Sequence, residues 1–569
     1  MRQPSASQHN FAKVPAVSIP RSVFARSNGY KTTFDCDYLI PFYIDEVLPG
    51  DTHTVQSTIQ ARLNTPYFPI MDNVYLTTFF FFVPNRLVWE NWEKMNGERN
   101  NPNDSIDYLT PSFAVPNADR AAGFLANYFG LKPNSAGLPG HITVNSLPFR
   151  MYNLIWNDWF RDQNLQDSVP VPVTDGGDNI SNYTLLRRGK QHDYFTSCLP
   201  WPQKGNAVSL PLGSSADVWG SITDTTPIAD WPLYSPVTGA YLDRVTDGTA
   251  LSRMQSAVIT SSGVGDNVAV TNDILAISGS STVSNSPQNY GFGNKALSQG
   301  AAPNARAPWT ADLSTATAVT INALRQAFAL QGLLERDARG GTRYVEVLRS
   351  HFGVISPDFR LQRPEYLGGG QTPLIISTVA QTSASENGSP QANLAAFGVF
   401  SAHGSRNGFT KSFVEHGFII GLLQVRADLN YQQGNERFWY RTDRFSYYWP
   451  ALAHLGEQAV LRREIYVSGS PSDTNVFGYQ EAWAEYRYKP SQITGAFNSL
   501  DPNSLDAWHL AQEFSLAPVL NSSFIQSDTP MDRVVVVPSE PQFKADIYNH
   551  VISARPMPVY SVPGLTDTF

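Results

Sequence analysis

A short basic cluster is the first part of the sequence whose residue types suggest chemistry. The segment LLRRGKQHDYF contains a run of cations followed by two aromatic rings: Arg187, Arg188, Lys190, Tyr194 and Phe195. Guanidinium and ammonium groups bind phosphates, and aromatic rings stack on unpaired bases, so this composition is typical of a contact with single-stranded nucleic acid. A solvated loop or a loop at a protein interface would have the same composition. Both interpretations stay open.

A second set of cations lies in residues 1–34, which contain no acidic residue. These five side chains are Arg2, Lys13, Arg21, Arg26 and Lys31. Ser, Pro and Asn fill the gaps without a sustained period, which predicts an arm lying over another surface and not a folded unit. The net charge of the whole chain is −8. This value argues against a protein that binds nucleic acid over its whole surface, but it allows a local basic patch.

The patterns of catalytic and metal sites do not occur in this sequence. None of the ten histidines belongs to an HExxH motif, and neither GxSxG nor GxxxxGK[ST] is present. The segment DGGDN, residues 175–179, is either a plain turn or a cation site, although it lacks the ligand ladder of a calcium loop. The two cysteines, Cys36 and Cys198, form no metal-binding pattern, so we expect two buried free thiols in a reducing compartment. The sequence predicts no enzyme, no cofactor and no metal.

Aromatic residues are concentrated in ERFWYRTDRFSYYWPALAHLGEQ, residues 436–458. Aromatic faces suit pyranose rings, so a sugar-stacking surface is one interpretation. Packing and subunit contacts are the interpretation that we favour at this density. Aromatic residues make up 12% of the chain and charged residues only 16%, against roughly 25% in an ordinary soluble domain. A chain of 569 residues with so few charges should hide much of its surface, and copies of itself are the expected cover.

Several strands must carry these residues. Phe79–Phe82 are four consecutive phenylalanines before Pro84, a run too short to span a membrane. Side chains alternate faces along a strand, so this strand must be covered on both sides. HTVQSTIQARL, residues 53–63, alternates as a half-buried strand does, and GFIIGLLQVRADL, residues 417–429, has the composition of a fully buried one. QAVLRREIYV and DRVVVVP are further predicted strands.

Helical spacing occurs in four places. Apolar residues recur at helical intervals in RLVWENWEKMNG, in RMYNLIWNDWF, in INALRQAFALQGLLERDARGG and in TRYVEVLRSHFG, which ends at Gly353. Between the second and the third, residues 206–308 change to Ser, Thr, Ala, Gly, Asn and Pro. Such a stretch is too long for a simple loop, and Trp219, Trp231 and Tyr234 favour partial order, so we interpret it as one large surface insertion. Strands before and after an insertion predict one sheet system of the jelly-roll kind.

Long blocks of the sequence resemble one family, the major capsid proteins of gokushoviruses, which are small isometric single-stranded DNA phages of the Microviridae. The resemblance covers roughly residues 10–205 and 310–569. The blocks are DEVLPGDT, LLRRGKQHDYFTSCLPWPQKG, LLERDARGGTRYVEVLRSHFGV, RLQRPEYLGGG, GFIIGLLQVRADLNYQQG, YWPALAHLGEQAVLRREIY, YRYKPSQITGAF and ISARPMPVYSVPGL.

The resemblance implies a mainly β fold: an eight-stranded antiparallel jelly roll, the viral capsid β-barrel, with helices and long interstrand insertions. It implies that 60 copies form a T=1 icosahedral shell around a circular single-stranded DNA genome. The expected partners are the chain itself, that DNA on the interior, a small basic DNA-binding protein, an internal scaffolding protein and a pilot protein of the same virus, and a bacterial surface receptor. The expected location is the virion, and the host bacterial cytoplasm during assembly.

Four parts of the chain follow from this reading: a basic interior arm at 1–34, the first half of the core at 35–205, the insertion at 206–308 and the second half with the C-terminal segment at 309–569. The arm and the 187–190 cluster are expected to face DNA. The insertion is expected to form a threefold protrusion for host attachment, with these receptor candidates: Trp219, Trp231, Tyr234, Tyr290 and Phe292.

The alternative function class is a secreted carbohydrate-binding or glycan-cleaving jelly-roll protein. It would share the aromatic richness, but it requires a signal peptide and paired carboxylates framed by aromatic rings on a concave face. Neither feature is recognisable in the sequence.

Overall fold

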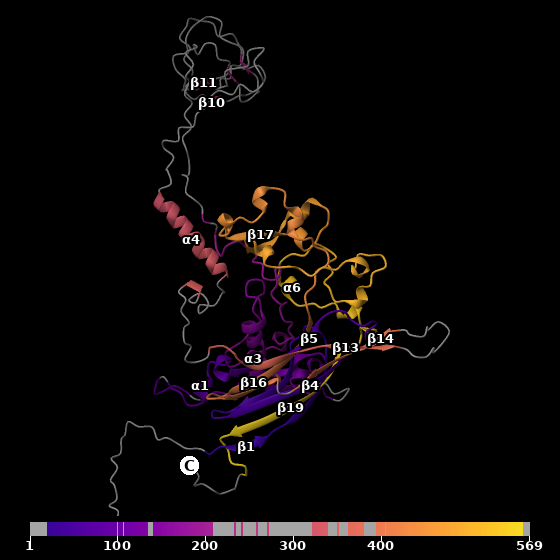
Figure 1. Cartoon of the computed structure of the whole chain (residues 1–569). Coiled ribbons are helices and arrows are strands. Elements are labelled where there is room, and N and C mark those ends of the chain that lie inside the picture. The colour runs from indigo at the N-terminus through magenta and orange to yellow at the C-terminus, as the bar shows by residue number, and fades with distance from the viewer. Residues whose placement is uncertain are drawn as a thin grey trace, which may run out of the picture. The chain divides into compact units, whose positions relative to one another are not determined.

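The computed structural model describes residues 20–99, 101–105, 107–134, 140–206, 208, 321–339, 350–351, 362–380, 394–403 and 406–560, together with four two-residue strands between residues 233 and 271. The chain divides into two compact units, one formed by residues 1–206 and 333–569 and the other by residues 207–332. The first unit is mainly β, and its strands pair antiparallel (Figure 1). This confirms the expected mainly β class. Within the described residues no helix is long and apolar enough to cross a membrane.

Two sheets dominate the first unit. The larger sheet has seven strands: β1 (Ser22–Ala25), β2 (Asn28–Phe34), β4 (Thr52–Leu63), β13 (Ile375–Ala380), β14 (Leu394–Ala402), β15 (Gly408–Ser412) and β19 (Phe543–Arg555). The smaller sheet has four: β3 (Ile40–Val47), β5 (Val74–Pro84), β12 (Glu365–Pro373) and β16 (Gly417–Ala427). β19 pairs with β4 on one side and with β1 and β2 on the other, so the yellow and indigo strands of Figure 1 run side by side.

Shorter elements surround the two sheets. The small hairpins are β6 (Ser112–Pro116) with β7 (His141–Asn145), and β17 (Glu457–Leu461) with β18 (Val476–Glu481). The α-helices of this unit are α1 (Trp92–Met95), α2 (Leu125–Tyr128), α3 (Leu147–Ile155) and α6 (Ser522–Ile525). In the second unit β8 (Leu233–Tyr234) pairs with β9 (Tyr241–Leu242), and β10 (Val258–Ile259) pairs with β11 (Val270–Thr271). The helix α4 (Ile321–Arg339) begins in the second unit and ends in the first.

The main core lies between the two sheets, and the predicted alternation of β4 supplies one side of it. Val55, Ser57, Ile59, Ala61 and Leu63 are all buried, while the residues between them are exposed along most of the strand. The strand prediction is therefore confirmed. Its inward side chains meet those of the smaller sheet in one continuous cluster.

The four phenylalanines occupy β5, in the middle of the smaller sheet. Phe80 and Phe82 belong to the core between the sheets. Phe81 belongs to a second core on the other face, where α3 packs and Phe79 is half-buried. The Phe81 ring lies 5.8 Å from that of Phe160, which follows α3. A strand buried on both faces is what the run predicts, and the structure confirms it.

Three local predictions need correction. DRVVVVP is not a strand: a 3₁₀ turn at Met531–Arg533 is followed by the buried Val534 and Val535, and only an isolated bridge from Val535 to Pro66 forms. RLVWENWEKMNG forms a 3₁₀ turn and the four-residue α1 instead of one helix. In QAVLRREIYV the strand ends at Leu461 and a 3₁₀ turn follows. The apolar residues in these segments indicated correctly that side chains are buried. They did not indicate the backbone conformation, because contacts with distant parts of the chain determine it.

Candidate functional site

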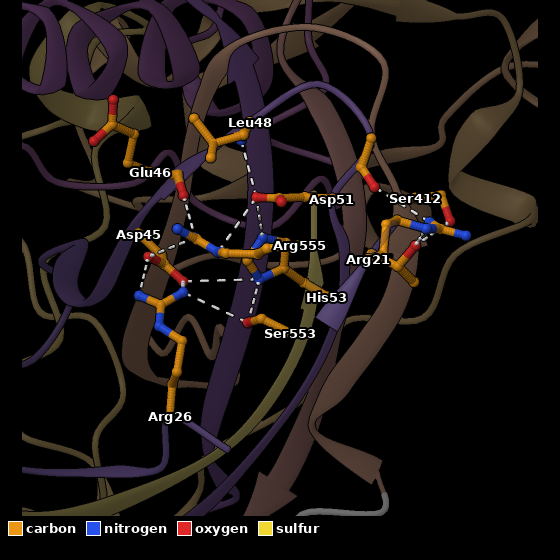
Figure 2. Close-up of polar contacts among 12 residues, drawn as sticks. Arg21, Arg26, Asp45, Glu46, Leu48, Asp51, His53, Ser412, Ser553 and Arg555 are labelled. Carbon is orange, nitrogen blue, oxygen red and sulfur yellow. Dashed lines mark hydrogen bonds and ion pairs between the residues drawn. The ribbon is translucent and has the colours of Figure 1, made fainter. Parts of the chain in front are cut away.

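A cluster of polar side chains lies where β3 and β19 end and β4 begins (Figure 2). Asp45 comes from β3, His53 from β4, and Ser553 and Arg555 from the end of β19. Asp51 lies in the turn between β3 and β4. Strands that are adjacent in space but about 500 residues apart in the chain therefore bring these groups together.

The aspartates hold the cluster together through two arginines. Arg26, which follows β1, binds Asp45 in a bidentate pair with N···O distances of 2.7 and 2.8 Å. Arg555 lies 3.5 Å from the Asp51 carboxylate and donates to the Glu46 carbonyl oxygen at 2.7 Å. Two carboxylates thus face two guanidinium groups. Paired geometry of this kind offsets the cost of removing the charges from water.

His53, Ser553 and Asp51 have the connectivity of a catalytic triad. The Ser553 hydroxyl is 2.9 Å from His53 Nδ1, and His53 Nε2 is 3.1 Å from Asp51 Oδ2. All three residues are fully buried, at 0% exposure. Ser553 also stands within a paired strand, opposite His53 in the register of β4 and β19. A nucleophile must reach its substrate, so this arrangement stabilises the fold and does not perform acyl transfer.

Burial sets the protonation of the cluster. Desolvation lowers the pKa of His53, and the opposing effects of Asp51 and Asp45 do not overcome it. The imidazole is therefore neutral near neutral pH. Desolvation is the largest single effect on the pKa of Arg26 and lowers it, but the hydrogen bonds to Asp45 together with the nearby charges of Asp45 and Asp51 outweigh it, and the net shift is upward. The cluster is charge-balanced, with a neutral histidine between two ion pairs.

The same cluster fixes the beginning of the described chain. The amide of Arg26 donates to the Val551 carbonyl oxygen at 2.8 Å, next to the Arg26–Asp45 pair. Arg21 donates to the Gly50 carbonyl oxygen and to the Thr52 hydroxyl, each at 3.2 Å. Lys31 in β2 pairs with Asp546 at the surface. Arg21 and Arg26 thus have positions fixed by the sheet, while Arg2 and Lys13 lie outside the described residues.

The basic cluster at 187–190 divides between surface and interior. Arg187 is half-buried, pairs with Asp528 at 2.6 Å and lies over the Tyr38 ring. Arg188 lies over the rings of Phe79 and Phe160, and burial together with Arg426 lowers the pKa of Arg188 to about 10.

Lys190 is the most buried of the three. It is 7% exposed, and its ammonium lies 4.2 Å from the centre of the Phe524 ring. Burial lowers the pKa of Lys190 to about 8, although Asp193, Asp528 and Asp37 act in the other direction. In the single chain, therefore, the three cations do not form one open patch.

Replacing Lys190 by methionine should raise the free energy of unfolding at pH 7. In the unfolded chain a lysine titrates near 10.4, so between pH 8 and that value the unfolded state binds more protons and stability rises with pH. Below pH 8 the buried charge costs about 3 kcal/mol at most. Denaturant titration of Lys190→Met at pH 7 and pH 10 should show the gain at pH 7 and a smaller pH dependence. Lys544→Met, at an exposed site, is the control, and a loss of stability in Lys190→Met at pH 7 would contradict the prediction.

Of the predicted receptor candidates, only Tyr234 lies within the described residues. Tyr234 belongs to β8, and Trp219, Trp231, Tyr290 and Phe292 lie outside the described residues. Both cysteines are buried free thiols, as expected, and the pKa of each is raised by burial.

The segment DGGDN is a turn whose two aspartates hold other parts of the chain. Asp175 accepts hydrogen bonds from the Trp89 indole and the Asn91 amide, at 2.7 and 2.8 Å. Asp178 forms a bidentate pair with Arg150 of α3, and both N···O distances are 2.9 Å. Within the described part of the chain, no three or more His, Cys, Asp or Glu side chains lie together in a group that could hold a metal ion. The two carboxylates of this turn therefore bind side chains of other segments and hold those segments together.

The polar cluster was not predicted from the sequence. Asp51 and His53 are separated by one residue, but Arg26 and Ser553 are far away in the chain, and no local motif joins them. The one available signal was the polar break in an otherwise apolar alternation, which occurs at His53 in β4. Two sheets packed against a shared core, with buried polar groups that hold the strand ends together, favour a structural role for this protein.

The comparisons with known proteins agree with that class. Residues 12–565 match the family model described as Capsid protein (F protein). The chain is 46% identical to Capsid protein VP1 of Bdellovibrio phage phiMH2K, and the match covers 99% of each chain. It is 42% identical to Capsid protein VP1 of Chlamydia phage 1 over 99% of this chain and 98% of that protein, and 37% identical to Capsid protein VP1 of Spiroplasma virus 4 over 99% of each.

The chain belongs to this family of phage capsid proteins, in its gokushovirus group within the Microviridae. It is a structural major capsid protein and not an enzyme, it assembles with copies of itself, and it is a component of the virion. The alternative of a secreted carbohydrate-active protein is thereby set aside.

Proposed function

We propose that 60 copies of this chain form a T=1 icosahedral shell around a circular single-stranded DNA genome. The observation that carries this proposal is the family match over residues 12–565, with relatives that match end to end. Assembly takes place in the host bacterial cytoplasm, where the buried free thiols of Cys36 and Cys198 suit the reducing conditions. Electron microscopy and sedimentation of the purified protein test the proposal: closed shells of megadalton size are expected, and a protein that stays monomeric at high concentration contradicts it.

The two sheets are proposed to form the eight-stranded jelly roll of this shell. The support is the pairing order: β2, β19, β4 and then β14 with β15 in one sheet, and β3, β16, β5 and β12 in the other. Along the chain, β2, β3, β4 and β5 lie alternately in the larger and the smaller sheet, and β12, β14, β16 and β19 alternate between the two sheets in the same way. This alternation is typical of a pair of Greek keys. On this reading β14 and β15, which pair one after the other with β4, together make one of the eight strands. β13 is an additional edge strand paired with β14, and β1 extends β2 along β19.

Residues 1–34 are proposed to lie on the interior of the shell and to meet the packaged DNA, although residues 22–25 and 28–34 are paired into the larger sheet as β1 and β2 and are not a separate arm. The support is a stretch with five cations and no acid, anchored at Arg21 and Arg26 to the sheet ends. Cations lower the repulsion among confined phosphates. Because five charges per chain cannot neutralise a genome, a small basic DNA-binding protein has to assist, alongside an internal scaffolding protein and a pilot protein. Of the expected DNA-facing set at 187–190, Arg187 is the candidate that we keep, because Arg188 lies over the rings of Phe79 and Phe160 and Lys190 is buried against Phe524 in the single chain.

Removing three of the five positive charges of residues 1–34 should reduce DNA packaging and leave shell formation intact. The variant is the triple replacement Arg2→Ala, Lys13→Ala and Lys31→Ala, which spares Arg26 because that residue binds Asp45 in the polar cluster. We expect fewer genomes per particle, measured as the ratio of absorbance at 260 and 280 nm in purified shells. Arg26→Ala alone is the comparison, because it loosens the arm while it keeps the other cations. Unchanged packaging in the triple variant would leave the arm a purely structural role.

Residues 206–308 are proposed to form the outward protrusion at the threefold axes, used in host attachment, between core halves at 35–205 and 309–569. The composition supports this, since small polar residues with occasional aromatic rings suit adaptable binding loops. Trp219, Trp231 and Tyr234 are assigned to the stalk, and Tyr290 and Phe292 to the tip, which meets a bacterial surface receptor.

Exchanging residues 278–294 for a Gly/Ser loop of equal length should abolish attachment to host cells. Particle yield and thermal stability should hold, because a tip contributes little to contacts between subunits. Adsorption of purified particles to host cells measures attachment, and a thermal melt of the particles measures their stability. Particles that fall apart would identify the segment as a clasp among three subunits instead.

A further inference from the structure

Two arginines have few partners on the face of the smaller sheet that carries the second core. Arg426 lies at the end of β16, and Arg188 lies against the same face, where its Nη1 donates to Gln424 Oε1 at 3.3 Å. A guanidinium carries several N–H donors. Among the described residues Arg188 makes only this one side-chain hydrogen bond, and Arg426 makes none. Most of the donor groups of this arginine pair are therefore left for a ligand or for water.

The strand register places a hydroxyl group beside the two arginines. Thr77 of β5 stands opposite Gln424 of β16, so the two side chains point to the same face of the sheet. Thr77 is 9% exposed, and its hydroxyl has no hydrogen-bond partner among the described residues. Arg426 Nη1 is also buried without a partner in that part of the chain. Buried polar groups are normally paired, so two unpaired ones on neighbouring strands indicate a binding site.

Aromatic rings hold the Arg188 guanidinium in place. Its central carbon lies 5.2 Å from the centre of the Phe79 ring and 5.5 Å from that of the Phe160 ring. Burial is the main cause that lowers the pKa of Arg188 to about 10, and the like charge of Arg426 is the second cause. The two guanidinium groups are thus close enough to repel each other. A group fixed in this way loses little conformational entropy when it binds a ligand.

The carboxylates closest to Arg426 bind other groups. Asp428 accepts a hydrogen bond from the side-chain amide of Asn73 at 3.1 Å, and Asp37 accepts one from the Thr529 hydroxyl at 3.1 Å. Burial lowers the pKa of Arg426, although the charges of Asp428 and Asp37 act in the other direction. No carboxylate of the described chain forms an ion pair with Arg426. The charges of the two arginines are therefore only partly compensated within the subunit.

We infer that Arg188 and Arg426 bind one phosphate group, with the Thr77 hydroxyl as a further donor. Guanidinium groups donate parallel hydrogen bonds to phosphate oxygens, and an anion between them removes their mutual repulsion. Both arginines are half-buried and reach the surface, and no hydrogen bond among the described residues fixes the Arg426 side chain, so it can turn toward the ligand. The phosphate comes from solution or from the backbone of single-stranded DNA. The inference does not depend on the proposed shell, because the site lies within one subunit.

Calorimetric titration of dissociated full-length subunits with inorganic phosphate tests the site, at an ionic strength held constant with chloride. The wild-type chain should bind one phosphate. Arg426→Met should weaken the affinity by about tenfold or more, because hydrogen bonds from a charged donor are lost. The variant should keep the wild-type circular dichroism, since the guanidinium that it removes makes no hydrogen bond in the described chain.

Arg62→Met is the matched control. Arg62 is an exposed arginine of β4, and it also makes no side-chain hydrogen bond among the described residues. Its replacement should leave the affinity for phosphate unchanged. Thr77→Val, which keeps the shape of the side chain and removes the hydroxyl, should weaken phosphate binding less than Arg426→Met does. Phosphate also stabilises proteins as a salt, but that effect is the same in all four chains.

A short oligothymidylate identifies the source of the phosphate group. If Arg426→Met weakens oligonucleotide binding as much as phosphate binding, and phosphate competes with the oligonucleotide, the ligand is the backbone of single-stranded DNA and Arg188 returns to the DNA-facing set. If Arg426→Met weakens only phosphate binding, the ligand is free phosphate. Both results support the site. The inference is overturned if wild-type subunits do not bind phosphate, or if Arg426→Met binds it as tightly as the wild type.

Discussion

Replacing Phe80 by alanine should lower the free energy of unfolding by about 3–5 kcal/mol, because the change removes a fully buried ring from the core between the sheets. The ring lies 5.5 Å from that of Phe42 and 5.3 Å from that of Phe409, so it contacts both sheets. A Cβ atom at Gly421 would lie 3.0 Å from the Phe80 ring, which shows how closely the neighbouring strand approaches. Thermal and denaturant unfolding of dissociated subunits measure the loss.

Phe397→Ala is the matched control for Phe80→Ala. Phe397 lies in β14 of the larger sheet and is 49% exposed, so its removal should cost less than about 1 kcal/mol. If the two variants lose equal stability, the space between the sheets is not the main core of the subunit.

Replacing Asp178 by alanine should have an effect of similar size for an electrostatic reason. The side chains of Arg150 and Asp178 are 0% and 1% exposed, so the variant leaves a buried guanidinium without its carboxylate. Breaking a buried pair in this way costs about 3–5 kcal/mol. The melting temperature of dissociated subunits should fall accordingly.

Two further variants separate charge from packing at Asp178. Asp546→Ala removes the partner of Lys31 in an exposed pair and should cost no more than about 1 kcal/mol. The double change Arg150→Met with Asp178→Leu should recover most of the loss, because no unpaired charge remains. If Asp178→Ala behaves like Asp546→Ala, the Arg150 charge reaches water in the variant.

Local periodicity predicted the strands whose inward residues are apolar. β4 follows its alternation, and β16, with the apolar run from Gly417, is buried almost throughout. Phe79–Phe82 predicted a strand covered on both faces for the same reason. DRVVVVP has an equally apolar composition but forms no strand, because Val534 and Val535 are buried within a loop that folds against residues near Pro66.

β19 shows why part of the larger sheet and the polar cluster escaped prediction. Its buried positions include Asn549 and Ser553, which interrupt the apolar alternation that identifies a strand. Asn549 accepts from the Ser57 hydroxyl at 2.6 Å, and Ser553 meets His53. Each polar residue is satisfied by a partner almost 500 residues away, so only the folded chain shows why it is tolerated. The resemblance to a family predicted the class of protein, but not these contacts.

The central position of β19 constrains the order in which a subunit is made. A ribosome synthesises β1, β2 and β4 long before residues 543–555, yet β19 separates β4 from β1 and β2 in the finished sheet. Until β19 emerges, one edge of β4 stays open, and the N-terminal strands have no neighbour in that sheet. Strand pairing over such a sequence separation is slow. We therefore expect that a chain that stops before residue 543 leaves the larger sheet open, because β4, β1 and β2 then lack the strand that joins them.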